Sequence, residues 1–238
     1  MAAIRSPHSR PRRTPHPSPL LVLGLGAWFL VGCAEPEPDP EGDPDPEEAA
    51  GEPAETESAV DAYWANLSAH CGQAFPGSLT LEPEGDDMLE GEELLVVHFD
   101  VCEEDEIRLP FHIEQMDGEW DRSRTWIFRP TDEGGIELRH DHRLPDGSED
   151  EVTWYGGYTV AEGEPTVQEF MVEEQYEAEE VDGPLVGWRV IIEPGERYVY
   201  GTVRGEEWTW RVDFDLSEPM DEVPPPAWGY EDGGGPPR

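Results

Sequence analysis

The chain has 238 residues, and its 56 acidic residues against 15 basic ones give a formal net charge of −41 at pH 7. This charge excludes nucleic acid as a partner, because phosphate binding depends on basic side chains, and it excludes docking on an anionic membrane through a basic face. Hydrophobic residues make up 36% of the sequence and include nine tryptophans, which is enough for one core rather than two.

The first 32 residues differ from the rest of the chain. They hold arginines but no acid, and an apolar run follows from Leu20 to Val31. As a helix this run is about 18 Å long, short of the roughly 30 Å hydrocarbon core of a bilayer. A basic stretch before a short apolar run is typical of a secretory signal, not of a permanent membrane span. We therefore expect residues 1–32 to be a signal peptide.

The apolar run ends in Leu30-Val31-Gly32-Cys33, which resembles the lipobox of bacterial lipoproteins. The resemblance implies that Cys33 is lipidated on its sulfur and becomes the first residue of the mature protein. Ala34 follows it instead of Asp, which in lipoproteins of double-membrane bacteria implies an outer-membrane location, facing the periplasm or the cell surface. Several acyl chains would anchor the protein stably. The alternative is an ordinary signal peptide whose cleavage site precedes a cysteine.

Two segments flank the region that can fold. Residues 33–57 are rich in acids and prolines and contain no base, so we expect a disordered tether that extends from the membrane. Residues 219–238 contain runs of Pro and Gly, and we expect a disordered tail in which Trp228 and Tyr230 do not dock on the domain. One domain, residues 58–218, remains between them.

The domain is expected to begin with one helix and to continue as strands. Ser58 can cap the helix with Asp61, and apolar residues then recur at helical spacing as far as Cys71. After residue 77 the period becomes two, most clearly in 207–216, where apolar side chains share one face and polar side chains the other. Residues 173–187 lack alternation, and we expect a long loop or a short helix there.

The fold class follows from the turns. Signals such as Asp117-Gly118 and Asp146-Gly147 separate the strands at short spacing, which favours antiparallel neighbours. A meander of about ten strands must bury its long apolar face. We expect a mainly β domain, an antiparallel up-and-down meander closed as a lipocalin-like barrel, with a β-sandwich as the alternative.

Two cysteines remain once Cys33 is assigned to the lipid. Cys71 follows the expected helix and Cys102 ends a strand. In an oxidising compartment such a pair is expected to form a disulfide, which would stabilise the fold by about 3–4 kcal/mol in the chain-entropy model. Two free thiols that act as metal ligands or as a nucleophile are the alternative.

Two histidines are candidates for chemistry. His140 and His142 share the apolar face of the expected strand 136–144, so both imidazoles would point into the barrel. A metal site of this geometry needs a third ligand from a neighbouring strand, and no third inward histidine is visible. A hydrogen-bonded pair in the barrel mouth and a ligand-contacting role are the other interpretations. His98 and His112 lie on the polar face of their hairpin, where we expect an incidental pair.

An aromatic-rich inner face indicates a binding module. Motifs for a serine nucleophile, a zinc protease or a phosphate-binding loop are missing, and no cofactor is expected. Besides the two histidines, the candidate ligand-binding residues are tryptophans of the expected strands: Trp154, Trp188, Trp208 and Trp210.

The leading hypothesis is a non-enzymatic outer-membrane lipoprotein that binds a small apolar or amphipathic ligand. One alternative is a metal-dependent hydrolase or lyase that uses His140 and His142. Another is a structural envelope component that contacts other proteins. The sequence does not indicate which proteins these are.

Several segments of the domain resemble uncharacterised bacterial secreted proteins. The segments are 121–126, 140–143, 146–150, 155–157 and 193–197. The resemblance covers most of the domain and implies no activity, so it supports the domain boundary alone.

Overall fold

The computed structural model describes residues 58–84, 89, 91–178 and 183–231. The expected signal peptide, the lipidation site at Cys33 and the tether lie outside the described residues, and so do residues 232–238 at the end of the expected tail. Among the helices in the described ranges, none is long and apolar enough to cross a membrane.

The elements have the following bounds: α1 Ala59–Ser68, β1 Ala74–Leu81, β2 Leu95–His98, β3 Val101–Cys102, β4 Ile107–Glu114, β5 Trp120–Pro130, β6 Ile136–His142, β7 Tyr155–Thr159, β8 Val167–Val172, α2 Glu173–Tyr176, β9 Val186–Glu193, β10 Arg197–Arg204 and β11 Glu207–Asp215.

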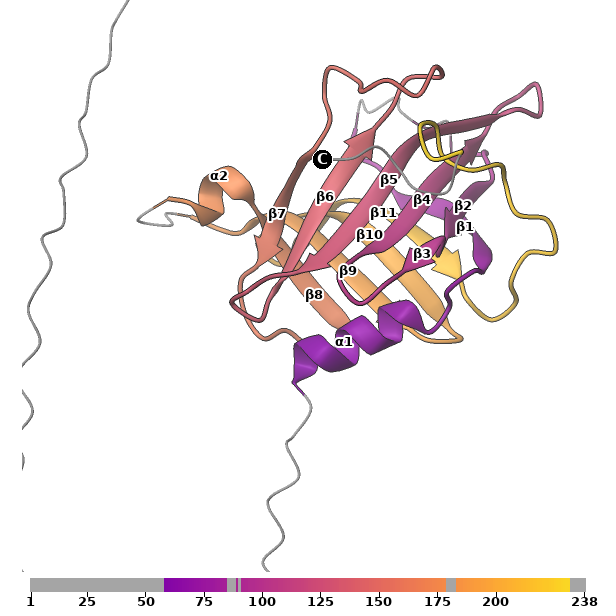
Figure 1. Ribbon diagram of the computed structural model, residues 1–238. Coiled ribbons are helices and arrows are strands. Elements are labelled where there is room, and N and C mark those ends of the chain that lie inside the picture. The colour runs from indigo at the N-terminus through magenta and orange to yellow at the C-terminus, as the bar shows by residue number, and fades with distance from the viewer. Residues whose placement is uncertain (1–57, 85–88, 90, 179–182, 232–238) are drawn as a thin grey trace, which may run out of the picture. The chain divides into compact units, whose positions relative to one another are not determined.

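The strands form a closed antiparallel barrel (Figure 1). Their order is β2-β1-β11-β10-β9-β8-β7-β6-β5-β4-β3, and an additional pairing of β2 with β4 joins the two sides of the sheet. Ten of the 11 strands therefore make the barrel, and the short strand β3 adds to it by pairing with β4. The predicted up-and-down meander is confirmed, and the closure excludes the sandwich.

Helix α1 begins where the sequence predicts. The hydroxyl oxygen of Ser58 accepts a hydrogen bond from the Asp61 amide at 3.0 Å, and the hydroxyl donates to the Asp61 carboxylate at 2.7 Å. Tyr63 and Leu67 on its inner face are fully buried in the same core cluster as the strands. The helix lies across one end of the barrel and closes it (Figure 1).

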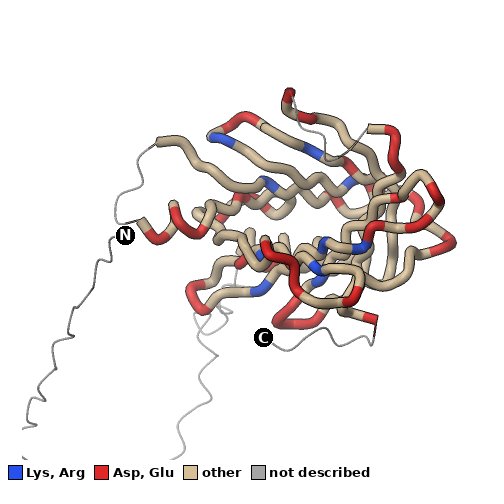
Figure 2. The backbone as a smooth tube through the Cα atoms, turned by 90° about the horizontal axis from the view of Figure 1, so that it is seen from above, with Lys and Arg blue, Asp and Glu red and all other residues tan. Residues whose placement is uncertain are grey.

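The core consists of the inward-facing rows of the strands. Along β11, Trp210, Val212 and Phe214 are buried, whereas Arg211 and Asp213 pair with each other on the outer face. Figure 2 shows Asp and Glu in many of the loops and Arg mainly within the strands. Arg129, Arg139 and Arg189 of other strands form further ion pairs with Glu side chains.

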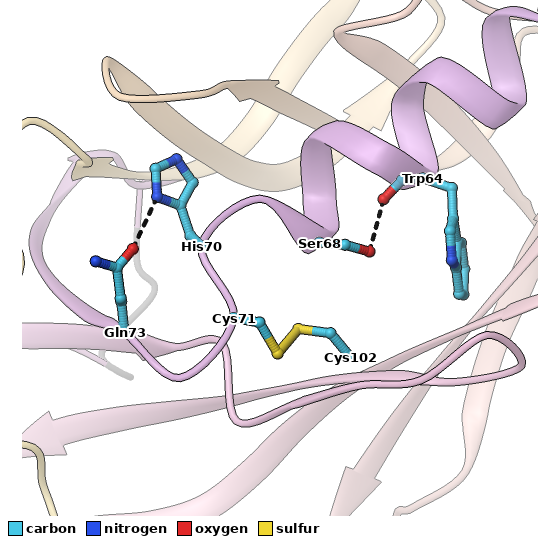
Figure 3. Close-up of a disulfide and its surroundings, with 6 residues drawn as sticks. All are labelled: Trp64, Ser68, His70, Cys71, Gln73 and Cys102. Atoms are coloured by element: carbon cyan, nitrogen blue, oxygen red, sulfur yellow. Dashed lines mark hydrogen bonds between the residues drawn. A yellow bond between two sulfur atoms is a disulfide. The ribbon is translucent and has the colours of Figure 1, made fainter.

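Cys71 and Cys102 form the predicted disulfide, with Cα atoms 5.9 Å apart (Figure 3). The bond ties the turn after α1 to β3. In the same turn, His70 Nδ1 lies 3.2 Å from Gln73 Oε1, and the His70 ring packs edge-on against Phe75 at 5.1 Å between centroids. These contacts fasten the helix to the end of the barrel that it closes.

Residues 219–231, which we call the strap, are ordered on the barrel instead of forming the expected disordered tail. The Met220 amide donates to the Ala74 carbonyl of β1 at 2.8 Å, and the Trp228 amide donates to the Arg122 carbonyl of β5 at 3.0 Å. Because β2 and β4 lie between β1 and β5 in the barrel, the strap crosses their outer face. Pro224, Ala227 and Tyr230 are buried there.

The strap changes the surroundings of side chains on the outer face of the barrel. The alternation of apolar and polar residues predicts that these side chains are exposed to water. Val96, His112, Ile127 and Asp141 are outward-facing, yet each is exposed by 2% or less. The expectation of a polar, solvated outer face is therefore wrong for β2, β4, β5 and β6. A local pattern could not show this, because the covering residues lie in a segment far along the chain.

Candidate functional site

Stacked aromatic rings fill the barrel interior. The Trp126 ring lies 4.0 Å from the ring of Tyr200 and 5.0 Å from that of Phe111, and both pairs are stacked. Tyr198 and Phe214 add further ring contacts, and all five residues belong to the core cluster. Rings at these separations leave no space for a ligand between them, so this part of the interior is packed core.

His140 points into the barrel from β6, as predicted, and is 2% exposed. Its Nδ1 lies 3.1 Å from the Tyr155 carbonyl oxygen, and its Nε2 lies 2.5 Å from the Tyr200 hydroxyl. In the neutral ring Nδ1–H donates to the carbonyl and Nε2 accepts from the hydroxyl. Burial lowers the pKa of His140 to about 3, so the neutral ring is the form present at pH 7. Both ring nitrogens have partners within the protein.

His142 lies at the end of the barrel opposite α1, which we call the open end. Its Nε2 is 3.3 Å from the hydroxyl of Tyr155, which is 38% exposed. Arg124 faces His142 across the β5–β6 register and forms an ion pair with Asp121 at 2.8 Å. Burial and the positive charge of Arg124 lower the pKa of His142. An imidazole, a phenol and a guanidinium thus meet within reach of solvent.

The four candidate tryptophans do not share one face. Trp188 and Trp210 point inward, are each 8% exposed and belong to the core cluster. Trp154 lies outside the core cluster, with the Arg129 guanidinium 5.1 Å from its ring centroid. Trp208 lies between two guanidinium groups, of Arg189 at 5.1 Å and Arg211 at 5.3 Å.

A β-bulge explains the position of Trp208. Thr202 of β10 pairs with Trp210, but the next residue, Val203, pairs with Trp208, so Thr209 is an extra residue in β11. The extra residue reverses the alternation and turns the Trp208 side chain onto the outer face, beside Arg211. The expectation that Trp208 and Trp210 share the inner face is therefore wrong.

A cavity of about 570 Å³ adjoins the open end, and we call it the hairpin cavity. The turn between β4 and β5, the loop after β6 and the strap line it, with Met116, Trp120, Asp121, Leu144, Asp150 and Trp228 among the lining residues. Two of its lining residues contact residues of the open end: Asp121 pairs with Arg124, and the Asp150 amide donates to the His142 carbonyl at 3.0 Å. A larger cavity of about 670 Å³ is lined by Val60, Thr131, Tyr158 and Tyr176, away from these residues.

The structure corrects the sequence-based expectation for His112. It is fully buried on the outer face, and neither ring nitrogen has a hydrogen-bond partner among the described residues. Burial, followed by the neighbouring His98, lowers the pKa of His112 to about 3. The His98 pKa is also lowered, mainly by burial. Both rings are neutral at pH 7.

The metal-dependent alternative gains no support from the geometry. In the ranges that the structure describes, no group of three or more His, Cys, Asp or Glu side chains could hold a metal ion. His140 and His142 do share the inner face of β6, but the nitrogens of His140 are both engaged in hydrogen bonds within the core. The two rings together therefore do not form the open ligand pair that such a site requires.

Three residues near the open end were not predicted to belong to the site, and one of them, Trp228, was expected not to dock on the domain. Arg124 could have been found, because it lies two residues before the inward-facing Trp126 on an uninterrupted strand. Trp120 and Trp228 could not, because they come together only when the strap returns to the β4–β5 turn. No local pattern contains that information.

Comparison of the chain with protein-family models, with curated proteins and with solved structures gave no match in any of the three.

Proposed function

We propose that the chain is an envelope lipoprotein, anchored through Cys33, whose barrel is a non-enzymatic binding module for a small amphipathic ligand held at the open end. The lipobox Leu30-Val31-Gly32-Cys33 supports the anchor, and the barrel fold is compatible with a binding role. The ligand would bind across the open end and not in the middle of the barrel, because the interior is packed with aromatic rings.

The observation that carries the binding role is that the hairpin cavity lies near the polar candidate residues of the open end, whereas the larger cavity of about 670 Å³ lies beside α1 and away from them. At one end, α1 covers the core with the fully buried Tyr63 and Leu67. At the other end, the partly exposed His142 and Tyr155 lie near the hairpin cavity of about 570 Å³, whose lining residue Asp150 donates its amide to the His142 carbonyl. This volume lies in the range of small-molecule sites, which combine apolar walls with a few convergent polar groups.

Native mass spectrometry of the full-length protein, extracted from the envelope in mild detergent, tests the binding role. We expect a carried small molecule in addition to the lipid anchor, and we expect it to be lost in a Leu144→Arg variant, which places a positive charge on the apolar wall of the cavity. Leu81→Arg, at another exposed leucine on β1, is the matched control and should retain the molecule. Absence of any carried molecule from the native protein would contradict the proposal.

Metabolic labelling with a palmitate analogue tests the anchor separately. We expect label on the native protein and none on a Cys33→Ser variant, which should also leave the membrane fraction. A Cys71→Ser, Cys102→Ser variant is the control, because it removes two thiols without touching the lipobox, and it should stay labelled. Equal labelling of the Cys33→Ser variant would exclude the anchor.

A further inference from the structure

We infer that the hairpin cavity binds a small organic cation with apolar substituents, such as a quaternary or tertiary ammonium group. The inference rests on the binding role proposed above and adds the chemical class of the ligand. The aromatic residues, the carboxylates and the apolar wall of the cavity support it.

Two tryptophans from distant parts of the chain line the cavity. Trp120 begins β5, and its ring contacts the buried His112 ring edge-on at 6.3 Å between centroids. Trp228 comes from the strap and is held in place by its amide hydrogen bond to the Arg122 carbonyl and by the Arg122 guanidinium 5.8 Å from its ring. Both side chains are half-buried, so part of each indole borders the cavity. Tryptophan faces attract cations more strongly than other aromatic rings.

Carboxylates outnumber basic groups in the lining. Asp117, Glu119, Asp121 and Asp150 are all lining residues, and the lining contains one basic residue, Arg143. The charge of Arg143 is already compensated, because its Nε lies 2.9 Å from the buried Asp141 carboxylate and its Nη2 lies 3.5 Å from Glu149.

Asp121 contributes a negative charge at pH 7. Burial raises its pKa, but hydrogen bonds from Ser123 and the neighbouring Arg124 more than offset this, so the pKa lies below its ordinary value. The Arg124 guanidinium, 2.8 Å from the Asp121 carboxylate, compensates the charge of Asp121. The remaining carboxylates give the cavity a negative potential, and the net charge of −41 adds to it over a longer range.

The rest of the wall is apolar. Leu144 is 43% exposed and Met116 is fully exposed, and both line the cavity together with Pro145. Such a wall offers few directional hydrogen bonds and favours alkyl groups. An alkylated ammonium ion satisfies all three features at once, because it presents methyl groups to indole and aliphatic surfaces and carries a diffuse positive charge toward the carboxylates. A neutral ligand would leave the carboxylates uncompensated, and an anion would be repelled.

Three probes of nearly equal shape test the charge requirement: choline, its neutral analogue 3,3-dimethylbutan-1-ol and the anion 3,3-dimethylbutanoate. Each is titrated into the full-length protein, with the indole N–H signals in ¹⁵N NMR spectra as the readout. We expect choline to bind at least tenfold more tightly than the alcohol, the anion not to bind, and choline binding to weaken as NaCl rises.

Two variants locate the site. Asp117→Asn combined with Glu119→Gln changes only exposed side chains of the β4–β5 turn, so the fold is retained, and we expect choline affinity to fall threefold or more. Trp228→Leu should lower it tenfold or more. Trp208→Leu, which removes a tryptophan that already lies between two arginines on the outer face, is the control and should leave choline affinity unchanged.

The outcomes separate this inference from the binding role. Equal binding of choline and the alcohol, or unchanged affinity in the Asp117→Asn, Glu119→Gln variant, would overturn the cation inference alone. The same holds if no probe binds although the native protein carries a ligand in mass spectrometry. If no probe binds and no ligand is carried, the inference and the proposed binding role fail together.

Discussion

Two buried histidines show that the same residue type has opposite effects on stability in two places. His140 has a partner on each ring nitrogen, whereas His112 has none among the described residues. A buried polar group without a partner costs about 1–3 kcal/mol, and one with satisfied hydrogen bonds contributes to stability. The two positions therefore make a matched pair for substitution.

We expect His112→Leu to raise the free energy of unfolding by about 1 kcal/mol, because it replaces an unpaired imidazole with an apolar side chain of similar size. His140→Leu should lower it by about 2 kcal/mol or more, because the Tyr200 hydroxyl and the Tyr155 carbonyl lose their partner. Urea unfolding at pH 7 measures both. A destabilised His112→Leu protein would contradict the absence of a hydrogen-bond partner for the His112 ring.

The same histidines predict an acid limit to stability. Burial lowers the pKa of His112 and of His140 to about 3, below the ordinary value of 6.5. Between about pH 6.5 and 3 the unfolded chain therefore binds protons that the folded protein does not, and stability falls as the pH falls. The His112→Leu variant should lose less stability than the native protein between pH 7 and pH 4.5. Identical slopes for the two proteins would contradict the low pKa of His112.

Among the elements, the strap is the one whose role the sequence did not indicate. The Tyr230 hydroxyl donates to the fully buried Asp141 carboxylate at 2.5 Å, and the Tyr230 ring lies 5.3 Å from the Arg108 guanidinium. A buried carboxylate depends on its donors, and the strap supplies one of them. The strap thus completes the outer face of β4, β5 and β6 and also brings Trp228 to the hairpin cavity.

Tyr230→Phe should lower the free energy of unfolding by about 1–3 kcal/mol, because Asp141 loses a hydrogen bond while it stays buried. Tyr176→Phe is the control, since Tyr176 is 45% exposed on α2 and its ring contact with Tyr158 does not need the hydroxyl. Thermal unfolding of the two variants side by side checks the difference. Equal melting temperatures would mean that the strap contributes nothing measurable through this bond.

For the whole molecule, the critical step is the closure of the barrel between its first and last strands. Gly77 of β1 pairs with Phe214 of β11 on one side and with Leu95 of β2 on the other. A Cβ atom at Gly77 would lie 2.3 Å from the Phe214 ring and 2.5 Å from the Asp213 carbonyl oxygen. The seam therefore closes only because this position has no side chain.

We expect Gly77→Ala to lower the free energy of unfolding by about 2 kcal/mol or more, because the strands at the seam must move apart or the Phe214 ring must leave its position. Ser78→Ala at the next, exposed position of the same strand should change it by less than about 0.5 kcal/mol. Amide hydrogen exchange should also show faster exchange at the β1–β11 ladder in Gly77→Ala. Native-like exchange there would show that the seam tolerates the added methyl group.

The elements could be predicted because their signals are local. The Ser58 cap of α1 and the alternation of β4, β6 and β11 were readable from neighbouring residues. The Cys71–Cys102 pair was predicted because two cysteines remain once Cys33 is assigned to the lipid. The bulge at Thr209 could not be read, since an alternating sequence does not reveal which residue remains unpaired until the partner strand is in place. Trp208 was therefore assigned to the wrong face.

By itself the sequence determined the mainly β class, the up-and-down order of the strands and the inward direction of His140 and His142, because hydrophobic periodicity and short turns act over a few residues. Only the tertiary structure decided that rings fill the interior, that His112 and Asp141 are buried on the outer face, and that Trp120 and Trp228 border one cavity. These features depend on contacts between segments far apart in the chain, and such contacts are set by the closed packing of the whole barrel and not by any local pattern.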